Sequence, residues 1–386
     1  MGAAKGAGPF DPAKLLFAGR QPEVAMRKLL LPLALIGACI IVDASRNALA
    51  FEFAQAAVVD AKKPLAYLMA PQARIDEVDL SSGHILATST RAAKPLLLYD
   101  SLLLAQAEPR EESEKLRLVG LDAKDLTVSF ELDVPLPAGV EALIDDRLGR
   151  SFYVGAHIDS GEIVVQWRSV QRRISGTPTN EPAHIATGWA RIDPSTGRLT
   201  GLGDGEASVR EDDLPASIGR LVHSGALASK PCLVDDLITA TESREANGTT
   251  AVILRRWKSE TGAGLPDVKL FGGELTFRSF SADCRHLLAS RAMDGWLWSI
   301  YSMTTGDKIA EIHMLAPAAQ FFIRDGSLFY IVPATMVRAG GQLKIDQPRK
   351  LSAIDLKAGN ELWSRPMRET TYLGPYPARR PNALAR

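Results

Sequence analysis

Three features of the sequence indicate an all-β chain built from repeated units. The first is a recurring turn in which an Asp precedes a Gly by four residues. The second is a pair of short apolar strands around an Asp near residues 94–108, which recurs near residues 230–242, about three periods of ~45 residues later. The third is the scarcity of long apolar patterns of period 3.6 after the N-terminus. Together they predict a single β-propeller of four-stranded antiparallel blades.

The recurring turn is expected to close a hairpin between the last two strands of each blade. An Asp side chain accepts a hydrogen bond from its own backbone two residues on, and Gly supplies the positive φ of a tight turn. We therefore interpret these aspartates as structural residues, not as catalytic carboxylates. The glycine-containing copies comprise Asp79 to Gly83, Asp193 to Gly197, Asp355 to Gly359, and two weaker copies that lack the Asp and end at Gly262 and Gly306. A further copy keeps Asp122 and lacks the Gly.

The propeller is expected to span residues 51–370. At ~45 residues a blade this length predicts seven blades, within a range of six to eight. Because six turns are visible, we expect the gap between Asp122 and Gly197 to hold a further blade. Residues 51–69 are expected to complete the last blade and close the ring. Residues 371–386 are predicted to form an irregular tail.

The N-terminus carries a targeting pattern. Arg27 and Lys28 precede an apolar run over residues 29–42, and a more polar stretch ends in Ala48 and Ala50. This order is typical of a secretory signal peptide over residues 26–50, cleaved after Ala50, and the run is short for a membrane span. Met26 is then the expected start, with residues 1–25 a mis-called or disordered extension. The alternative is an uncleaved anchor helix.

The three cysteines permit different fates. Cys39 lies in a loose lipoprotein-like box, but apolar residues follow it, whereas polar residues usually follow a lipidated Cys. Cleavage after Ala50 would leave Cys232 and Cys284, about one blade apart. An exported compartment permits a disulfide between them, and two separate buried thiols are the alternative.

Two segments resemble known propeller families. Residues 279–290 with 300–310 resemble a blade of the WD40/YVTN-like propellers, and residues 351–363, with Trp363 four residues past the Gly, resemble a quinoprotein-type repeat. The resemblance covers most of the chain after about residue 65 and is of superfamily grade. It implies the propeller fold. Quinone-dependent alcohol dehydrogenases are longer, and many carry an adjacent Cys pair that this chain lacks, so the resemblance does not imply their activity.

The sequence predicts no catalytic, cofactor-binding or metal-binding residues. The phosphate-loop, zincin, Cys-x-x-Cys and hydrolase-elbow motifs are missing, and the six histidines are scattered. A formal net charge of zero gives no electrostatic basis for nucleic-acid binding. Asp145 with Asp146 fits a strand-ending turn better than an acid–base pair, and Trp296 with Trp298 fits blade packing better than a stacking platform.

These observations favour a non-catalytic, exported propeller that acts as a protein-interaction scaffold in a bacterial cell envelope, in the periplasm or outside the cell. Its expected partner is another envelope protein. Membrane contact is expected only through the N-terminal segment, if that segment is uncleaved or lipidated. The alternative function is a periplasmic enzyme or small-ligand binder with its site at the axial funnel of the propeller.

Overall fold

A computed structural model describes residues 50–109, 114–147, 149–171, 184–205, 231–234, 236–246, 249–272, 277–316, 319–339 and 342–370. The chain divides into two compact units, residues 1–41 and 42–386, and every described residue belongs to the second. The predicted signal segment, apart from Ala50, and the predicted C-terminal tail lie outside the described residues. Over the ranges given above the chain forms strands and turns, and no helix there is long and apolar enough to cross a membrane.

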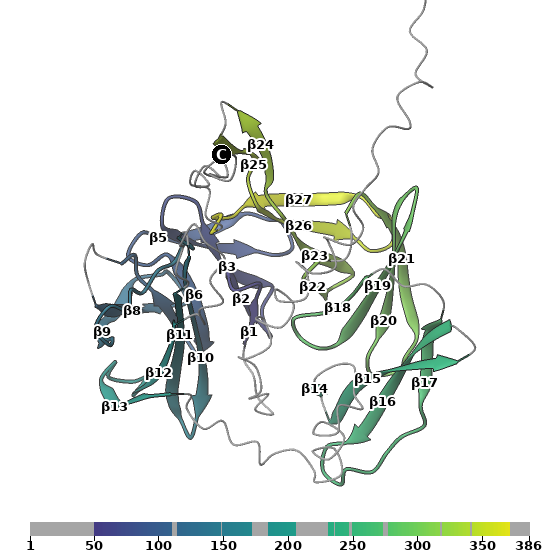
Figure 1. The fold of residues 1–386 in the computed structure, drawn as a ribbon, viewed down its shortest axis with the longest axis horizontal. Coiled ribbons are helices and arrows are strands. Elements are labelled where there is room, and N and C mark those ends of the chain that lie inside the picture. The colour runs from purple at the N-terminus through teal and green to yellow at the C-terminus, as the bar shows by residue number, and fades with distance from the viewer. Residues whose placement is uncertain are drawn as a thin grey trace, which may run out of the picture. The chain divides into compact units, whose positions relative to one another are not determined.

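The strands form sheets that follow one another along the chain (Figure 1). The first sheet contains β1 (Ala50–Phe53), β2 (Ala57–Asp60), β3 (Leu65–Ala70), β4 (Arg74–Asp79) and β5 (Ile85–Ser89). The second contains β6 (Lys94–Tyr99), β7 (Leu102–Gln106), β8 (Lys115–Asp122) and β9 (Val128–Pro135). The third contains β10 (Arg150–Asp159), β11 (Glu162–Gln171), β12 (His184–Ile192) and β13 (Leu199–Asp204).

The remaining sheets repeat this meander. The fourth contains β14 (Cys232–Val234), β15 (Leu237–Ala246), β16 (Thr249–Lys258) and β17 (Val268–Gly272). The fifth contains β18 (Phe277–Phe280), β19 (His286–Met293), β20 (Gly295–Ser302) and β21 (Lys308–Met314). The sixth contains β22 (Phe321–Arg324), β23 (Ser327–Val332), β26 (Lys350–Asp355) and β27 (Glu361–Pro366). A separate hairpin of β24 (Thr335–Ala339) and β25 (Gln342–Gln347) is inserted in the sixth sheet.

The predicted propeller of antiparallel blades is confirmed by these sheets, of which five have the predicted four strands and the first has five. In Figure 1 the early strand of each sheet lies toward the middle and the last strand toward the outside. The described residues form six blades, the lower end of the predicted range and one fewer than the favoured seven. The gap between Asp122 and Gly197 does not hide an extra blade among the described residues, because its strands β10 to β12 belong to the sheet that contains the Gly197 turn.

Each recurring turn lies between the last two strands of its sheet. In the first sheet the Gly83 amide donates to the Asp79 carbonyl at 2.7 Å, and the Ser81 amide donates to the Asp79 carboxylate at 2.8 Å. The hydrogen bonds that the carboxylate accepts from the Ser81 amide and the Ser82 hydroxyl lower the pKa of Asp79, as expected for a carboxylate that caps a turn. The Asp122 turn keeps the geometry without a glycine, because Leu126 occupies the equivalent position at a positive φ of 56° and its amide donates to the Asp122 carbonyl at 2.8 Å.

The glycine of the turn also receives a side chain from the preceding blade. A Cβ added at Gly83 would lie 2.6 Å from Trp363 of the last sheet, and one added at Gly197 would lie 2.3 Å from Phe130 of the second. At the Leu126 turn, Leu126 belongs to a hydrophobic cluster against which the small Ala87 of the first sheet packs. An aromatic residue therefore packs on the turn glycine at the two junctions of Gly83 and Gly197, whereas a leucine and an alanine share one cluster at a third.

The ring closes by side-chain packing between the first and last sheets, which corrects the expectation that residues 51–69 would complete the last blade. β1 to β3 pair within the first sheet, and β22, β23, β26 and β27 form a complete last sheet. A shared core, including Phe53 and Leu68 with Phe322 and Phe329, joins the two sheets. The indole nitrogen of Trp363 donates to the Leu80 carbonyl at 3.1 Å.

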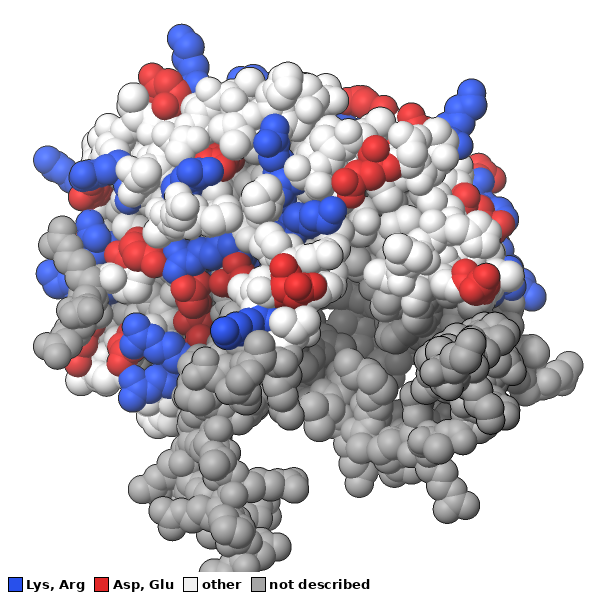
Figure 2. All heavy atoms as spheres, turned by 90° about the horizontal axis from the view of Figure 1, so that it is seen from above, with Lys and Arg blue, Asp and Glu red and all other residues white. Residues whose placement is uncertain are grey.

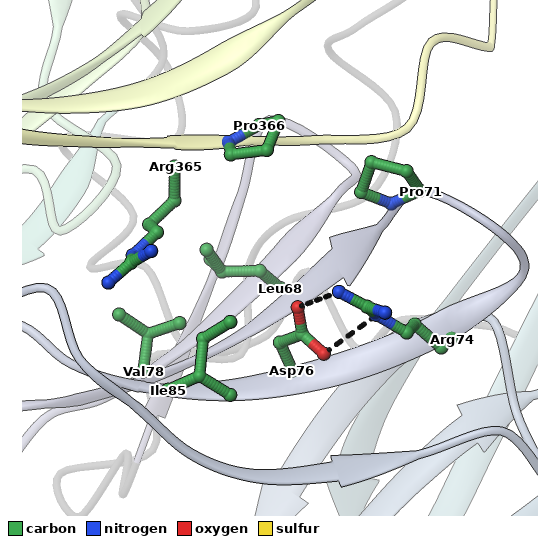
Figure 3. Close-up of a pocket in the computed structure, with 8 residues that line it drawn as sticks. All are labelled: Leu68, Pro71, Arg74, Asp76, Val78, Ile85, Arg365 and Pro366. Carbon is green, nitrogen blue, oxygen red and sulfur yellow. Dashed lines mark hydrogen bonds and ion pairs between the residues drawn. The ribbon is translucent and has the colours of Figure 1, made fainter.

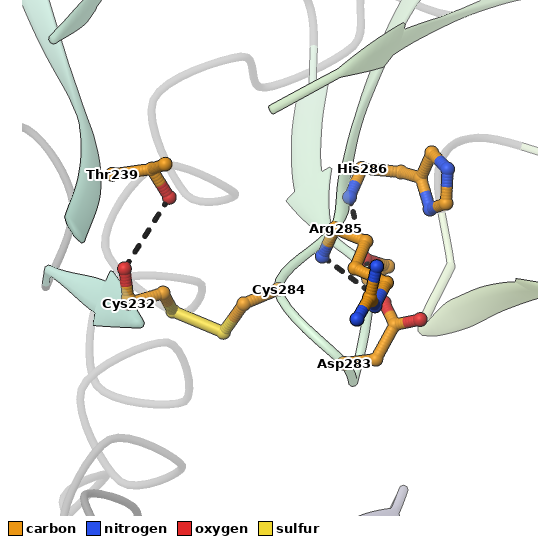
Figure 4. Close-up of a disulfide and its surroundings, with 7 residues drawn as sticks. Cys232, Thr239, Asp283, Cys284, Arg285 and His286 are labelled. Atoms are coloured by element: carbon orange, nitrogen blue, oxygen red, sulfur yellow. Dashed lines mark hydrogen bonds between the residues drawn. A yellow bond between two sulfur atoms is a disulfide. The ribbon is translucent and has the colours of Figure 1, made fainter. Parts of the chain in front are cut away.

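A disulfide joins the fourth and fifth sheets (Figure 4). It links Cys232, at the start of β14, to Cys284, in the turn before β19, with 6.0 Å between their Cα atoms. Of the two predicted states of these cysteines, the structure therefore contains the disulfide and not the two separate thiols. The same junction shares a hydrophobic cluster that includes Val252 and Leu287.

Candidate functional site

Charged side chains gather where the first, second and last sheets meet. Arg368, which follows β27, donates to both oxygens of Glu108 at 2.7 and 2.9 Å and to both oxygens of Asp145, one of them at 2.8 Å. Its side chain is only 14% exposed, so these charge-assisted bonds are partly shielded from water. Hydrogen bonds to the two carboxylates outweigh the effect of burial and raise the pKa of Arg368. Arg368 also anchors the chain through its amide, which donates to the Met69 carbonyl at 2.9 Å.

A second set of charges lies deeper, at the inner strands. Lys94 begins β6 with 6% of its surface exposed, and it interacts electrostatically with Glu52 of β1 and with Asp146. Burial raises the pKa of Glu52, and the charge of Lys94 opposes that rise. Burial lowers the pKa of Lys94, and the two carboxylates oppose that fall. Burial also raises the pKa of Asp146.

The side chain beside Lys94 is a buried amide. Gln106 of β7 pairs with Lys94 across the strands, is 1% exposed, and donates from Nε2 to the Ala142 carbonyl at 3.0 Å. Its Oε1 atom is buried and accepts no hydrogen bond from the part of the chain that the structure describes. Buried unlike charges with shifted pKa values and an unsatisfied acceptor occur both in ligand sites and in structural ion networks.

The predicted site residues are only partly brought together. Asp145 and Asp146 were expected to end a strand, and they instead belong to the charged groups around Arg368 and Lys94. The turn carboxylates of Asp79 and Asp193 are exposed and bonded to their own turns. Trp298 is fully buried, and its indole nitrogen donates to the Ala316 carbonyl at 3.0 Å, which is the packing role that the sequence favours.

Over the described ranges, no group of three or more His, Cys, Asp or Glu side chains could hold a metal ion.

The sequence did not indicate Glu52, Lys94, Arg349 or Arg368. Arg349 donates to the Ala54 carbonyl at 3.1 Å, 295 residues away in the sequence. Contacts of this kind form only when the ring closes, so no local sequence pattern predicts them. The one available signal is a Lys at the head of the apolar run Pro95 to Leu98, where a buried strand begins with a charge.

A small pocket opens at the same closure, on the side of β4 and β27 (Figure 3). Its volume is about 210 Å³. Leu68, Val78 and Ile85 lie between two polar walls in Figure 3, with Arg365 on one side and the Arg74–Asp76 ion pair on the other. Pro71 and Pro366 complete the lining. The pocket therefore combines an apolar base with guanidinium groups.

Two further surface features bear on function. Lysines and arginines are interspersed with acidic residues over the described part of the face shown in Figure 2, so no charge of one sign dominates it.

The inserted hairpin leaves apolar side chains exposed to water, with Met336, Val337 and Ile345 exposed by 38%, 45% and 39%. Met336 and Ile345 are opposite each other across the two strands.

Comparison with known proteins gives distant structural likeness alone. No protein-family model matches the chain, and no curated protein matches it. Among solved structures, a europium-containing methanol dehydrogenase is similar at 10% identity, with 82% of this chain and 79% of that chain covered and a TM-score of 0.36.

Two quinohemoprotein alcohol dehydrogenases are also similar. The one from Comamonas testosteroni has 11% identity, 83% coverage of this chain and a TM-score of 0.26. The one named ADHIIG from Pseudomonas putida HK5 has 10% identity, 71% coverage and a TM-score of 0.25. The chain spans 61% of the length of each.

Proposed function

We propose that this chain is an exported, non-catalytic β-propeller that acts as a scaffold for another envelope protein. The observation that supports it best is the inserted hairpin β24–β25. β23 and β26 pair directly, with Val332 opposite Lys350, so the hairpin occupies residues 333–349 without adding a strand to the blade. The corresponding connection in the fifth sheet needs a single residue between Met293 and Gly295.

The physical argument is that a two-stranded ribbon is marginally stable in water unless a further strand or a packed surface completes it. The Met336–Ile345 pair leaves more than a third of each side chain exposed, and the hairpin pairs with no third strand among the described residues. A partner segment that adds a strand to the ribbon would cover this pair and satisfy one of its open edges. The partner is therefore proposed to bind as an extended, apolar-rich protein segment.

The exported location rests on two features. The N-terminal pattern that ends at Ala50 is typical of secretion, and the Cys232–Cys284 disulfide is of the kind that persists in an oxidising compartment. Sequencing the mature N-terminus tests it. A start at or near Phe51 supports cleavage and export, whereas a mature peptide that spans Ala50 and Phe51 contradicts cleavage.

The scaffold proposal is tested by affinity capture from membranes, followed by mass spectrometry. Met336→Asp combined with Ile345→Asp places charge on the hairpin face. The matched control is Ile309→Asp on β21, because Ile309 is 45% exposed and lies on the outer strand of another blade. We expect a stoichiometric partner with the wild type and with the control, and at least about a tenfold loss with the double variant. Equal capture by the double variant, or recovery of a free monomer, contradicts the proposal.

The second candidate function is a ligand site or enzyme at the inner strands, supported by Glu52, Lys94 and Asp146 with the unsatisfied Oε1 of Gln106. A free monomer in the capture experiment would favour it. Its own test is a metabolite-mixture binding screen, followed by mass spectrometry, of the wild type and Lys94→Met. A small molecule retained by the wild type and lost in Lys94→Met supports the inner site. Retention of the same molecule by both proteins shows that Lys94 does not bind it.

A further inference from the structure

We propose that the pocket between the first and last sheets binds a carboxylate attached to a small apolar group. This inference goes beyond the scaffold function and does not depend on the hairpin. The carboxylate would bind the guanidinium of Arg365, and the apolar group would lie on Leu68, Val78 and Ile85. A peptide ending in an apolar residue and a free aliphatic carboxylate share this chemistry.

The charge in the pocket decides the ligand class. Arg74 lies against Asp76, with one terminal nitrogen 3.2 Å from Oδ2 and Nε 3.1 Å from Oδ1. Thr88 also donates to Oδ1 of Asp76 at 2.9 Å. Asp76 is 5% exposed and is therefore a buried carboxylate whose charge is already compensated. The ion pair on this side of the pocket therefore has no net charge.

Arg365 on the other side is different. Its Nε donates to the Gly83 carbonyl, which fixes the direction of the side chain. Its two terminal nitrogens make no hydrogen bond or ion pair with the residues that the structure describes, and the side chain is half-buried beside the pocket. The pocket therefore contains one uncompensated positive charge. The two free nitrogens are the donors that a carboxylate accepts in a bidentate pair.

The base of the pocket is apolar. Leu68 and Val78 are almost fully buried, and Ile85 remains 42% exposed at the entrance. An apolar ligand group would remove the exposed part of Ile85 from water. A volume of about 210 Å³ lies below the 300–1,000 Å³ range of sites for drug-sized ligands, so the occupant is the size of about one residue.

The pocket also lies between the two sheets that close the ring. Leu68, Val78 and Ile85 belong to the first sheet, whereas Arg365 and Pro366 belong to β27 of the last. A ligand that binds both walls stabilises the closed ring, because binding to the folded state alone raises stability by mass action. Ligand binding is therefore expected to raise the melting temperature of the protein.

The experiment uses calorimetric titration and thermal unfolding of the full chain with N-acetyl-leucine. The amide of the same compound removes the carboxylate, and acetate removes the apolar group. We expect N-acetyl-leucine to bind with a Kd of about 1 mM or tighter and to raise the melting temperature, with the amide and acetate at least about tenfold weaker. Equal binding of acid and amide, or no acid binding, overturns the proposal.

Variants locate the site. Arg365→Met should abolish binding, whereas Arg324→Met should retain it. Arg324 is a matched control because it also donates to first-sheet carbonyls, those of Asp60 and Ala61, and lies outside the pocket. Equal loss in both variants would indicate a loosened junction and contradict the assignment.

A second pair of variants leaves the hydrogen bonds between the first and last sheets in place. Ile85→Asp places a negative charge at the entrance and should weaken binding by about tenfold or more, while Leu86→Asp, at the next and 57% exposed residue, should not. Unchanged binding by Ile85→Asp contradicts the proposal.

A further titration distinguishes the two sources of the carboxylate, a protein C-terminus and a free small molecule. A peptide ending in Leu that binds about tenfold more tightly than N-acetyl-leucine identifies a protein C-terminus as the ligand. Equal affinity of the peptide, N-acetyl-leucine and hexanoate identifies a free small carboxylate, and either result supports the pocket chemistry. The hairpin variant Met336→Asp with Ile345→Asp should retain all of this binding, so failure of the scaffold function and failure of the pocket are distinguishable.

Discussion

Two junctions of the propeller differ in that one of them contains a covalent bond between blades. Where the last sheet meets the first, Trp363, Arg365, Arg324 and Arg349 donate to main-chain oxygens of the first sheet. Where the fourth sheet meets the fifth, a disulfide crosslinks Cys232 and Cys284. The first set joins residues more than 260 positions apart, and the second joins residues 52 positions apart.

The difference shows how a propeller can close without exchanging a strand. The last sheet is complete from its own segments, so closure depends on many side-chain contacts with main-chain acceptors, each of modest energy. The disulfide acts chiefly on the unfolded chain, which it restricts. We therefore expect the two junctions to respond differently to reduction, to substitution and to pH.

The largest effect is expected from removing the disulfide. Cys232→Ala with Cys284→Ala should lower the free energy of unfolding by about 4 kcal/mol, because a bridge across 52 positions removes loop-closure entropy from the unfolded chain. Urea unfolding with and without reductant measures it. The wild type should lose a similar amount in reductant and the double variant should lose nothing further. Insensitivity of the wild type to reductant, together with free thiols in a thiol count, would show that the bridge does not form.

A smaller effect is expected at the closing junction, where the Gly83 turn can be compared with the Gly359 turn, which has the same φ of 72° but faces Ile312 of the fifth sheet. Gly83→Ala should cost about 3 kcal/mol, because the new Cβ is strained by the positive φ and lies 2.6 Å from Trp363. Gly359→Ala should cost about 1 kcal/mol, because its nearest neighbour, Ile312, is 3.6 Å away and only the backbone strain remains.

The comparison is made by urea unfolding of both variants. Gly83→Ala combined with Trp363→Ala should cost less than the sum of the two single changes, since the clash disappears with the indole. Equal costs for Gly83→Ala and Gly359→Ala would show that Trp363 does not pack on Gly83 in solution.

The sequence predicted the features that depend on local chemistry. The Asp79 to Gly83 turn and its relatives were read as hairpin turns because Asp capping and positive φ need only neighbouring residues. Ring closure was predicted wrongly, because a swapped strand and a side-chain closure leave the same local pattern in residues 51–69. Asp145 and Asp146 look like turn residues, and their ionic partners, Arg368 and Lys94, lie far away in the chain. Long-range charge pairing is therefore invisible to local sequence patterns.

The smallest expected effect is on the pH dependence of stability, and it compares the inner strand β1 with the outer strand β27. Burial raises the pKa of Glu52, so the folded state holds a proton above pH ~4.3 that the unfolded chain has released. Its contribution to stability is therefore lost as pH rises through that window.

Glu361 should show the opposite dependence. Burial raises its pKa, but hydrogen bonds from Ser352 and Lys350 outweigh burial and lower it, so its contribution is lost as pH falls below ~4.3. Glu52→Gln should remove a downward slope in stability from about pH 4.3 upward, and Glu361→Gln should remove an upward slope below it. Urea unfolding from pH 3 to pH 8 measures both (about 25 °C, constant ionic strength). Parallel curves for Glu52→Gln and the wild type would contradict a raised pKa of Glu52, because the folded and unfolded states would then release this proton over the same pH range.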